Sequence, residues 1–149
     1  MNTTEEIKIK KVHTFLDLAI ASVVTAAGVG LYFLLPGWGV LFCLIGILLF
    51  AFYRRANKRV GERTLLKEAS LDIDPGCRSG ILDFLGGKAD TMECEAASEG
   101  SHLYLQVYYN ADETVAYAQL YDVAENSFEP ATGMTELRGP KAQTLIGKL

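Results

Sequence analysis

The sequence predicts a membrane-embedded α-helical hairpin of two transmembrane helices, followed by a small cytoplasmic α+β domain with an antiparallel sheet and helices on one face. Two apolar stretches that lie almost end to end, residues 15–35 and 38–53, predict the hairpin. Alternating strand patterns that end in a short amphipathic helix predict the second part. We therefore divide the chain into an N-terminal cytoplasmic segment (1–13), the hairpin (14–53), a basic juxtamembrane linker (54–63) and the α+β domain (64–149).

The two apolar stretches predict membrane helices by their length. An α-helix needs about 20 apolar residues to cross the hydrocarbon core of a bilayer. The second stretch, with 16 residues, is short, and the snorkelling side chains of Arg54 and Arg55 would extend it. Asp17 is the one charged residue in either stretch. Because it lies near the start of the first helix, we expect a solvated interfacial position for it rather than a buried one.

A cleaved signal peptide is the alternative interpretation of the first stretch, with Lys8, Lys10 and Lys11 as its basic region. The apolar core of a signal peptide usually has about 7–15 residues. Here the apolar run is longer and a second one follows directly. We therefore expect the first stretch to be retained as a membrane helix.

Basic residues flank both ends of the hairpin, whereas its turn at 36–39 has no charge. By the positive-inside rule, both termini of this two-pass protein lie in the cytoplasm, and we expect the inner membrane of a bacterium. The residues expected at the membrane interface are an aromatic anchor in the turn and the basic residues after the second helix. They are Trp38, Arg54, Arg55, Lys58 and Arg59.

Small residues recur every four positions along the first helix, at Ser22, Ala26 and Gly30. Such a pattern allows another helix to approach closely within a membrane. The approaching helix is either the second helix of the same hairpin, through Gly39 and Gly46, or a helix of another protomer.

The net charge differs sharply between the two halves of the chain. Residues 60–149 contain seven basic and fifteen acidic residues, a net charge of −8, whereas residues 1–59 carry +4. The basic part favours contact with anionic lipid head groups. An acidic domain without a basic stripe excludes nucleic acid as an expected partner.

No pattern in the sequence indicates catalysis, a metal or a cofactor. Cys43, Cys77 and Cys94 are odd in number and face a reducing compartment, which argues against a disulfide framework. The two histidines are far apart in sequence, and neither a phosphate-binding glycine loop nor a nucleophile elbow is present. We therefore expect a protein without enzymatic activity, metal or cofactor.

The α+β domain is expected to follow the order β-α-β-β-β-β-α. The predicted helix near 81–85 is capped by Ser79 and ends at Gly86 and Gly87, and the terminal helix begins at Pro140. The predicted strands span residues 64–73, 91–97, 103–110, 114–123 and 133–137, with turns at 74–76 and 98–101.

The central hairpin carries the most specific pattern of the domain. With Asp112 and Glu113 as its turn, residues whose numbers sum to 225 face each other. Two tyrosines and one glutamine per strand then share one face, which is the candidate binding site. These residues are Tyr104, Gln106, Tyr108, Tyr117, Gln119 and Tyr121. The reverse face is apolar, and we expect both helices to cover it.

This polar aromatic face has three interpretations: an ordinary solvated strand surface, a protein interface, or a platform on which a nucleotide-like ligand stacks. We favour a non-enzymatic protein-interaction or oligomerisation module held at the lipid bilayer, with another protein or a second copy as partner. The alternatives are a ligand-sensing membrane effector, whose small-molecule ligand has no support in the sequence, and an enzyme with dispersed catalytic residues.

Overall fold

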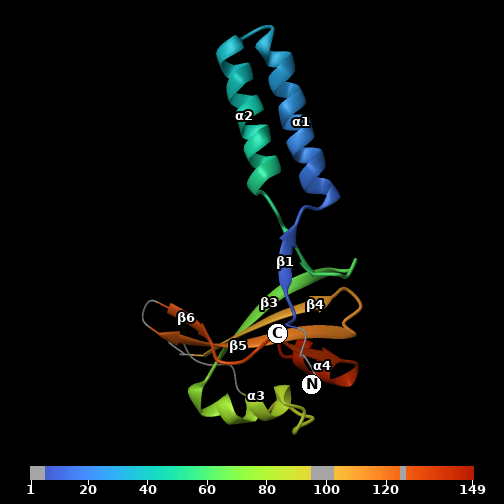
Figure 1. Cartoon of the computed structure of the whole chain (residues 1–149), viewed down its shortest axis with the longest axis vertical. Coiled ribbons are helices and arrows are strands. Elements are labelled where there is room, and N and C mark those ends of the chain that lie inside the picture. The colour runs from blue at the N-terminus through green and yellow to red at the C-terminus, as the bar shows by residue number, and fades with distance from the viewer. Residues whose placement is uncertain (1–5, 95–102, 125–126) are drawn as a thin grey trace. The chain divides into compact units, whose positions relative to one another are not determined.

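The computed structural model describes residues 6–94, 103–124 and 127–149. The chain separates into two compact units (Figure 1). One unit comprises Lys10–Ala56, and the other comprises Met1–Ile9 together with Asn57–Leu149.

The first unit is a pair of helices, α1 (Phe15–Tyr32) and α2 (Pro36–Phe52). Pro36 occupies the first turn of α2, where its missing N–H leaves no hydrogen bond unmade. The prediction that residues 36–39 form the turn is therefore wrong, because α2 already begins there. Among the described residues, α1 alone is long and apolar enough to be a candidate membrane span, and α2 is a shorter apolar helix of 17 residues.

Glycines bring α1 and α2 into close contact. A Cβ atom on Gly39 would lie 2.4 Å from the Cα atom of Tyr32, and one on Gly46 would lie 2.1 Å from Oγ1 of Thr25. Gly28 is equally tight, since its Cβ would lie 2.6 Å from the backbone nitrogen of Cys43. The two helices thus approach at three positions where only hydrogen fits.

Asp17 ties the start of α1 to the residues that follow α2. Its Oδ2 accepts hydrogen bonds from the backbone nitrogen of Thr14 at 3.0 Å and from that of Arg55 at 3.4 Å. Thr14 Oγ1 in turn accepts from the Asp17 backbone nitrogen, which completes a capping box. Asp17 is 3% exposed, so the expectation of a solvated position is wrong. Its carboxylate instead satisfies backbone donors at the helix end.

The second unit is built on an antiparallel sheet, which confirms the predicted α+β class. The seven strands of the sheet are β1 (Ile9–Val12), β2 (Ala56–Arg59), β3 (Leu65–Ile73), β4 (Leu103–Asn110), β5 (Val115–Ala124), β6 (Ser127–Pro130) and β7 (Thr135–Arg138). Most of β1 and the first residue of β2 belong to the first unit by the division given above, and the other strands lie in the second. The strand order is β1-β2-β3-β4-β5-β6, and β7 also pairs with β5. The long strand β5 is therefore paired with two short strands along the same edge.

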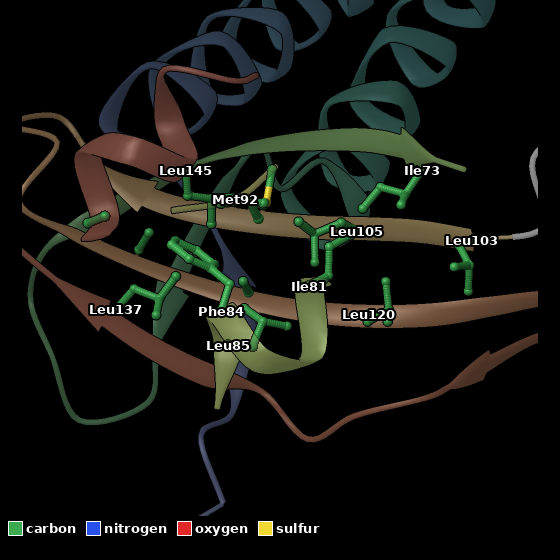
Figure 2. Close-up of a cluster of buried hydrophobic side chains, with 14 residues drawn as sticks. Ile73, Ile81, Phe84, Leu85, Met92, Leu103, Leu105, Leu120, Leu137 and Leu145 are labelled. Atoms are coloured by element: carbon green, nitrogen blue, oxygen red, sulfur yellow. The ribbon is translucent and has the colours of Figure 1, made fainter. Parts of the chain in front are cut away.

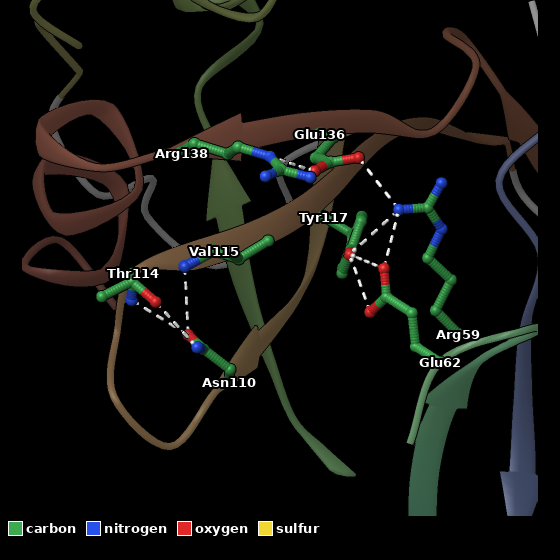
Figure 3. Close-up of polar contacts among 8 residues, drawn as sticks. All are labelled: Arg59, Glu62, Asn110, Thr114, Val115, Tyr117, Glu136 and Arg138. Atoms are coloured by element: carbon green, nitrogen blue, oxygen red, sulfur yellow. Dashed lines mark hydrogen bonds and ion pairs between the residues drawn. The ribbon is translucent and has the colours of Figure 1, made fainter. Parts of the chain in front are cut away.

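The register predicted for the central hairpin is confirmed. Tyr108 pairs with Tyr117, Gln106 with Gln119 and Tyr104 with Tyr121. The connecting loop spans residues 111–114, and Glu113 at its centre has a positive φ of 57°. Asn110 holds the loop closed (Figure 3), because its Oδ1 accepts from the backbone nitrogens of Thr114 and Val115 at 2.9 and 3.0 Å.

The apolar face of the sheet is covered by α3 (Arg78–Leu85) and α4 (Pro140–Ile146), as expected. Figure 2 shows how Phe84, from α3, and Leu145, from α4, meet strand residues such as Leu105 and Leu120. All four side chains are completely buried. The core thus lies on one side of the sheet and leaves the other side for a site.

Two local predictions in this unit are wrong. Ser79 does not cap α3, because a 3₁₀ turn (Pro75–Cys77) precedes the helix and Asp74 caps that turn by accepting from the Gly76 backbone nitrogen at 2.7 Å. Residues 91–94 are not a strand, although Met92 is 2% exposed and belongs to the core. The rest of the predicted strand 91–97 and the turn 98–101 lie outside the described residues.

Candidate functional site

The candidate site is the face of the sheet opposite α3 and α4, which we call the tyrosine face. The register places the six predicted residues on it: Tyr104, Gln106 and Tyr108 from β4, and Tyr117, Gln119 and Tyr121 from β5. Tyr117 is 1% exposed, and the other five are half-buried. The face is therefore a partly covered surface.

Tyr117 is covered by an ionic cluster that comes from two separate segments, residues 59–62 and strand β7 (Figure 3). Nη1 of Arg59, in β2, lies 3.0 Å from Oε1 of Glu62, 3.1 Å from Oε2 of Glu136 and 3.3 Å from the Tyr117 hydroxyl. The Arg59 guanidinium carbon lies 5.5 Å from the centre of the Tyr117 ring. One arginine thus binds two carboxylates and stacks on a tyrosine, a combination that the planar guanidinium group allows.

Gln106 belongs to a second polar group on the tyrosine face. Its Nε2 donates to Oε1 of Glu68 at 2.9 Å, and Nδ2 of Asn57 donates to Oε2 of the same carboxylate at 2.8 Å. A carboxylate only accepts hydrogen bonds, so this contact fixes the orientation of the Gln106 amide. Its carbonyl oxygen is consequently the end that remains for another donor.

Gln119 is fixed in the same way. Its Nε2 donates to the backbone oxygen of Thr132 at 3.0 Å, and its Oε1 accepts from the Tyr121 hydroxyl at 2.9 Å. The side-chain amide nitrogens of both glutamines therefore donate hydrogen bonds within the protein itself.

A pocket of about 320 Å³ opens at the end of the tyrosine face beside β6. It is lined by Tyr104, Gln106, Tyr121 and Phe128, and we call it the aromatic pocket. The Tyr104 ring lies edge-to-face with Tyr121 at 6.4 Å and with Phe128 at 5.9 Å between centroids. Phe128 is 65% exposed. Three rings thus surround an open, apolar space with one amide in its lining.

The electrostatics of this face suppress ionisation of its tyrosines. Partial burial, with a smaller contribution from the charge of Glu68, raises the pKa of Tyr108 to about 12. Burial also raises the pKa of Tyr121, and that of Tyr117 in spite of Arg59, which acts in the opposite direction. These hydroxyls are neutral donors and acceptors at neutral pH, so the tyrosine face is suited to binding rather than to proton abstraction.

Comparison with known proteins gives no family for this chain. No family model matches it, and no curated protein or solved structure shows a significant similarity. The site must therefore be interpreted from its own residues.

The predicted interface residues have several different environments. Trp38 is 61% exposed near the start of α2, Arg54 is exposed and Lys58 is half-buried. The Arg55 guanidinium stacks on Tyr53, with its carbon 4.5 Å from the ring centre. Arg59, in contrast, extends onto the tyrosine face.

The predicted helix-packing residues fall into two groups. Gly39 and Gly46 lie against α1, as described above. Ser22, Ala26 and Gly30 are exposed, and a Cβ on Gly30 would meet no atom within 4 Å. The structure therefore does not use this stripe as the main contact between α1 and α2.

The cysteines and acidic residues of the described part form no obvious reactive site. Cys43, Cys77 and Cys94 are all unpaired thiols, and no group of three or more metal-ligating side chains occurs within residues 6–94, 103–124 and 127–149. Burial is the main cause that raises the pKa of Cys94 to about 12, so its thiolate is scarce at neutral pH.

Several residues of the site were not predicted from the sequence. Phe128 lies in a four-residue edge strand that ends at Pro130, a residue that disfavours a strand prediction. Glu62 and Glu136 approach Tyr117 only through the tertiary fold. The one available signal was the aromatic residue at 128, two residues before a proline in a region of turn-forming residues.

Proposed function

We propose that this protein is a two-pass protein of a bacterial inner membrane, with both termini in the cytoplasm, whose α+β domain binds another protein without catalysing a reaction. The observation that carries the proposal is the aromatic pocket. Its rings are those of Tyr104 and Tyr121, which are half-buried, and of Phe128, which is exposed, whereas the neighbouring Gln106 and Gln119 amides pair with other groups of the domain. Exposed aromatic side chains on a rigid surface are typical anchors of protein interfaces.

The helical unit supports the membrane part of the proposal. Helix α1 has 18 residues, a mean hydropathy of 1.7, and only 17% of them are buried. A core helix of a water-soluble protein would be mostly buried. Large apolar side chains on α2 are also exposed, among them Phe52 at 79% and Phe50 at 59%. A bilayer is the environment that would cover such a surface.

A protein partner fits the tyrosine face better than a nucleotide does. A nucleotide needs cations for its phosphates. The arginines that the described residues bring to this face are Arg59 and Arg138, and both are paired with Glu136. An aromatic surface with a polar rim, on which the described arginines are already paired, favours a protein, whether another chain or a second copy.

Site-specific photo-crosslinking in cells tests the binding part. A photoreactive phenylalanine analogue is placed at 128 or 104, and at Leu82 as a control, because Leu82 is 37% exposed on the helix-covered side of the sheet. We expect discrete adducts of higher mass from positions 128 and 104 only. An absence of adducts, or the same adducts from all three positions, would rule out binding at this face.

Cysteine labelling in a cysteine-free background tests the membrane part. Gly37→Cys lies in the first turn of α2 and Asp112→Cys in the hairpin loop of the sheet. An impermeant maleimide should label G37C in intact spheroplasts and D112C only after permeabilisation. An N-terminal epitope should remain on the membrane-bound protein. Its loss would show that the first stretch is a cleaved signal peptide.

A further inference from the structure

The aromatic pocket has the chemistry of a receptor for a hydrogen-bond-donating organic cation. We propose that the aromatic pocket binds the guanidinium group of an arginine in a basic segment of the protein partner. This inference rests on the proposed function and specifies the chemistry of the partner.

The aromatic rings supply the first part of the argument. Tyr104 lies roughly perpendicular to both Tyr121 and Phe128, with interplanar angles of 62° and 76°. These three rings, inclined to one another, line the same space of about 320 Å³. A cation over the face of such a ring is attracted by its quadrupole.

Unused hydrogen-bond acceptors supply the second part. Gln106 lines the pocket, and its Nε2 is held by Glu68, which leaves Oε1 as the remaining acceptor. Asp72 pairs with Tyr104 in the register and is exposed on the same face. Within the described part of the chain, the side chain of Asp72 makes no hydrogen bond or ion pair. A ligand that meets these groups must donate hydrogen bonds, and the adjacent carboxylates favour one with positive charge.

The same face already contains this arrangement in filled form. The Arg59 guanidinium stacks on Tyr117 and pairs with Glu62 and Glu136. The aromatic pocket likewise has tyrosine rings in its lining, and Asp72 is the cross-strand neighbour of one of them, Tyr104. No cation of the described residues lines this pocket. A guanidinium group suits it better than an ammonium group, because it is planar, weakly hydrated and has five donors.

The charge of the domain agrees with a basic partner. Residues 60–149 carry a net charge of −8. Such a field attracts a basic segment and repels an acidic one, and the attraction weakens as salt increases.

Fluorescence anisotropy with labelled peptides tests the inference on the full chain in detergent. The probe is acetyl-Gly-Arg-Gly-Arg-Gly-amide at low salt, and the comparison peptides replace arginine by lysine or by citrulline, which keeps the shape but removes the charge. We expect the arginine peptide to bind about tenfold more tightly than the citrulline peptide, with lysine in between. Equal affinity for arginine and citrulline would overturn the inference.

Variants locate the binding. Phe128→Ala should lower the affinity for the arginine peptide about tenfold, and Asp72→Asn should lower it severalfold. Asp112→Asn removes the same charge from the exposed hairpin loop and should change the affinity less than about twofold. Equal losses in D72N and D112N, with none in F128A, would show diffuse attraction to the acidic surface and overturn the site.

The two proposals fail in different ways. Adducts at position 128 together with equal binding of arginine and citrulline peptides would retain the interaction module and reject the arginine. An absence of adducts would reject the module, and the arginine inference with it.

Discussion

Arg59 and Tyr117 are 58 residues apart in sequence, yet Nη1 of the arginine lies 3.3 Å from the hydroxyl of the tyrosine. The side chain of Arg59 is 22% exposed, and those of Glu62 and Glu136 are 39% and 20% exposed. The ionic cluster is therefore partly removed from water, so its interactions are screened less than those of a surface ion pair.

Replacing Arg59 should destabilise the α+β domain. In Arg59→Gln, two partly buried carboxylates lose their shared cation, which we expect to lower the free energy of unfolding by about 1–2 kcal/mol. Urea unfolding of the full chain in detergent, followed by near-ultraviolet circular dichroism of the tyrosines, measures this change.

The matched control is Lys88→Gln. Lys88 pairs with Asp83 at 3.8 Å, and its side chain is 80% exposed. Exposed pairs contribute about 0–1 kcal/mol. Equal effects of R59Q and K88Q would contradict a special role for the ionic cluster.

Much of the fold could be predicted from the sequence, because strands and helix ends leave local patterns: alternating apolar and polar residues in strands, and proline or glycine at helix boundaries. Alternation from Leu103 to Tyr109 separates an apolar face from a polar one, and this separation determines the register of the hairpin. Pro140 and Gly86 likewise mark a helix start and a helix end. The strand predicted from residue 91 was wrong over 91–94, because Met92 packs into the core from a segment without regular secondary structure.

The residues of the site that lie on β4 and β5 could be predicted from the sequence, whereas their partners from other segments could not. The six residues on β4 and β5 could be predicted from the alternation of apolar and polar side chains along each strand, which is a local property of the sequence. The partners that pair with them come from other segments: Glu68 from β3, Arg59 from β2 and Phe128 from β6. Arg59 belongs to the run of basic residues after the second apolar stretch, and that run predicted a contact with lipid head groups. In the structure its side chain lies on Tyr117 instead.

The stability of the domain should fall at alkaline pH. The pKa of Tyr108 rises from its ordinary value of 10.0 to about 12 in the folded state, mainly through burial. Between these values the folded state binds more protons than the unfolded state, so the free energy of unfolding decreases as pH rises. The contribution is complete below pH 10 and is lost through pH 12. Tyr108→Phe should flatten this decline, and parallel curves for variant and wild type over pH 9–12 would contradict the assignment.

The core should show a strong contrast between two neighbours on α3. Phe84 is completely buried, whereas Leu82 is 37% exposed. Phe84→Ala removes an aromatic ring from the core and should lower the free energy of unfolding by about 3–5 kcal/mol. Leu82→Ala should lower it by less than about 1 kcal/mol. Similar urea midpoints for the two variants would mean that α3 does not cover the sheet as described.

The helical pair offers a test that separates steric fit from helix propensity. In Gly39→Ala the new methyl group would lie 2.4 Å from the Tyr32 backbone, so α1 and α2 must move apart. Gly30→Ala is the matched control, because nothing lies within 4 Å of its new methyl group. Alanine is intrinsically about 1 kcal/mol better than glycine in a helix interior, so G30A should preserve or raise stability. We therefore expect G39A to lower the thermal midpoint of helix unfolding in detergent, and G30A not to lower it. If G30A were the more damaging change, the exposed stripe of Ser22, Ala26 and Gly30 would be a contact with another protomer rather than a free surface.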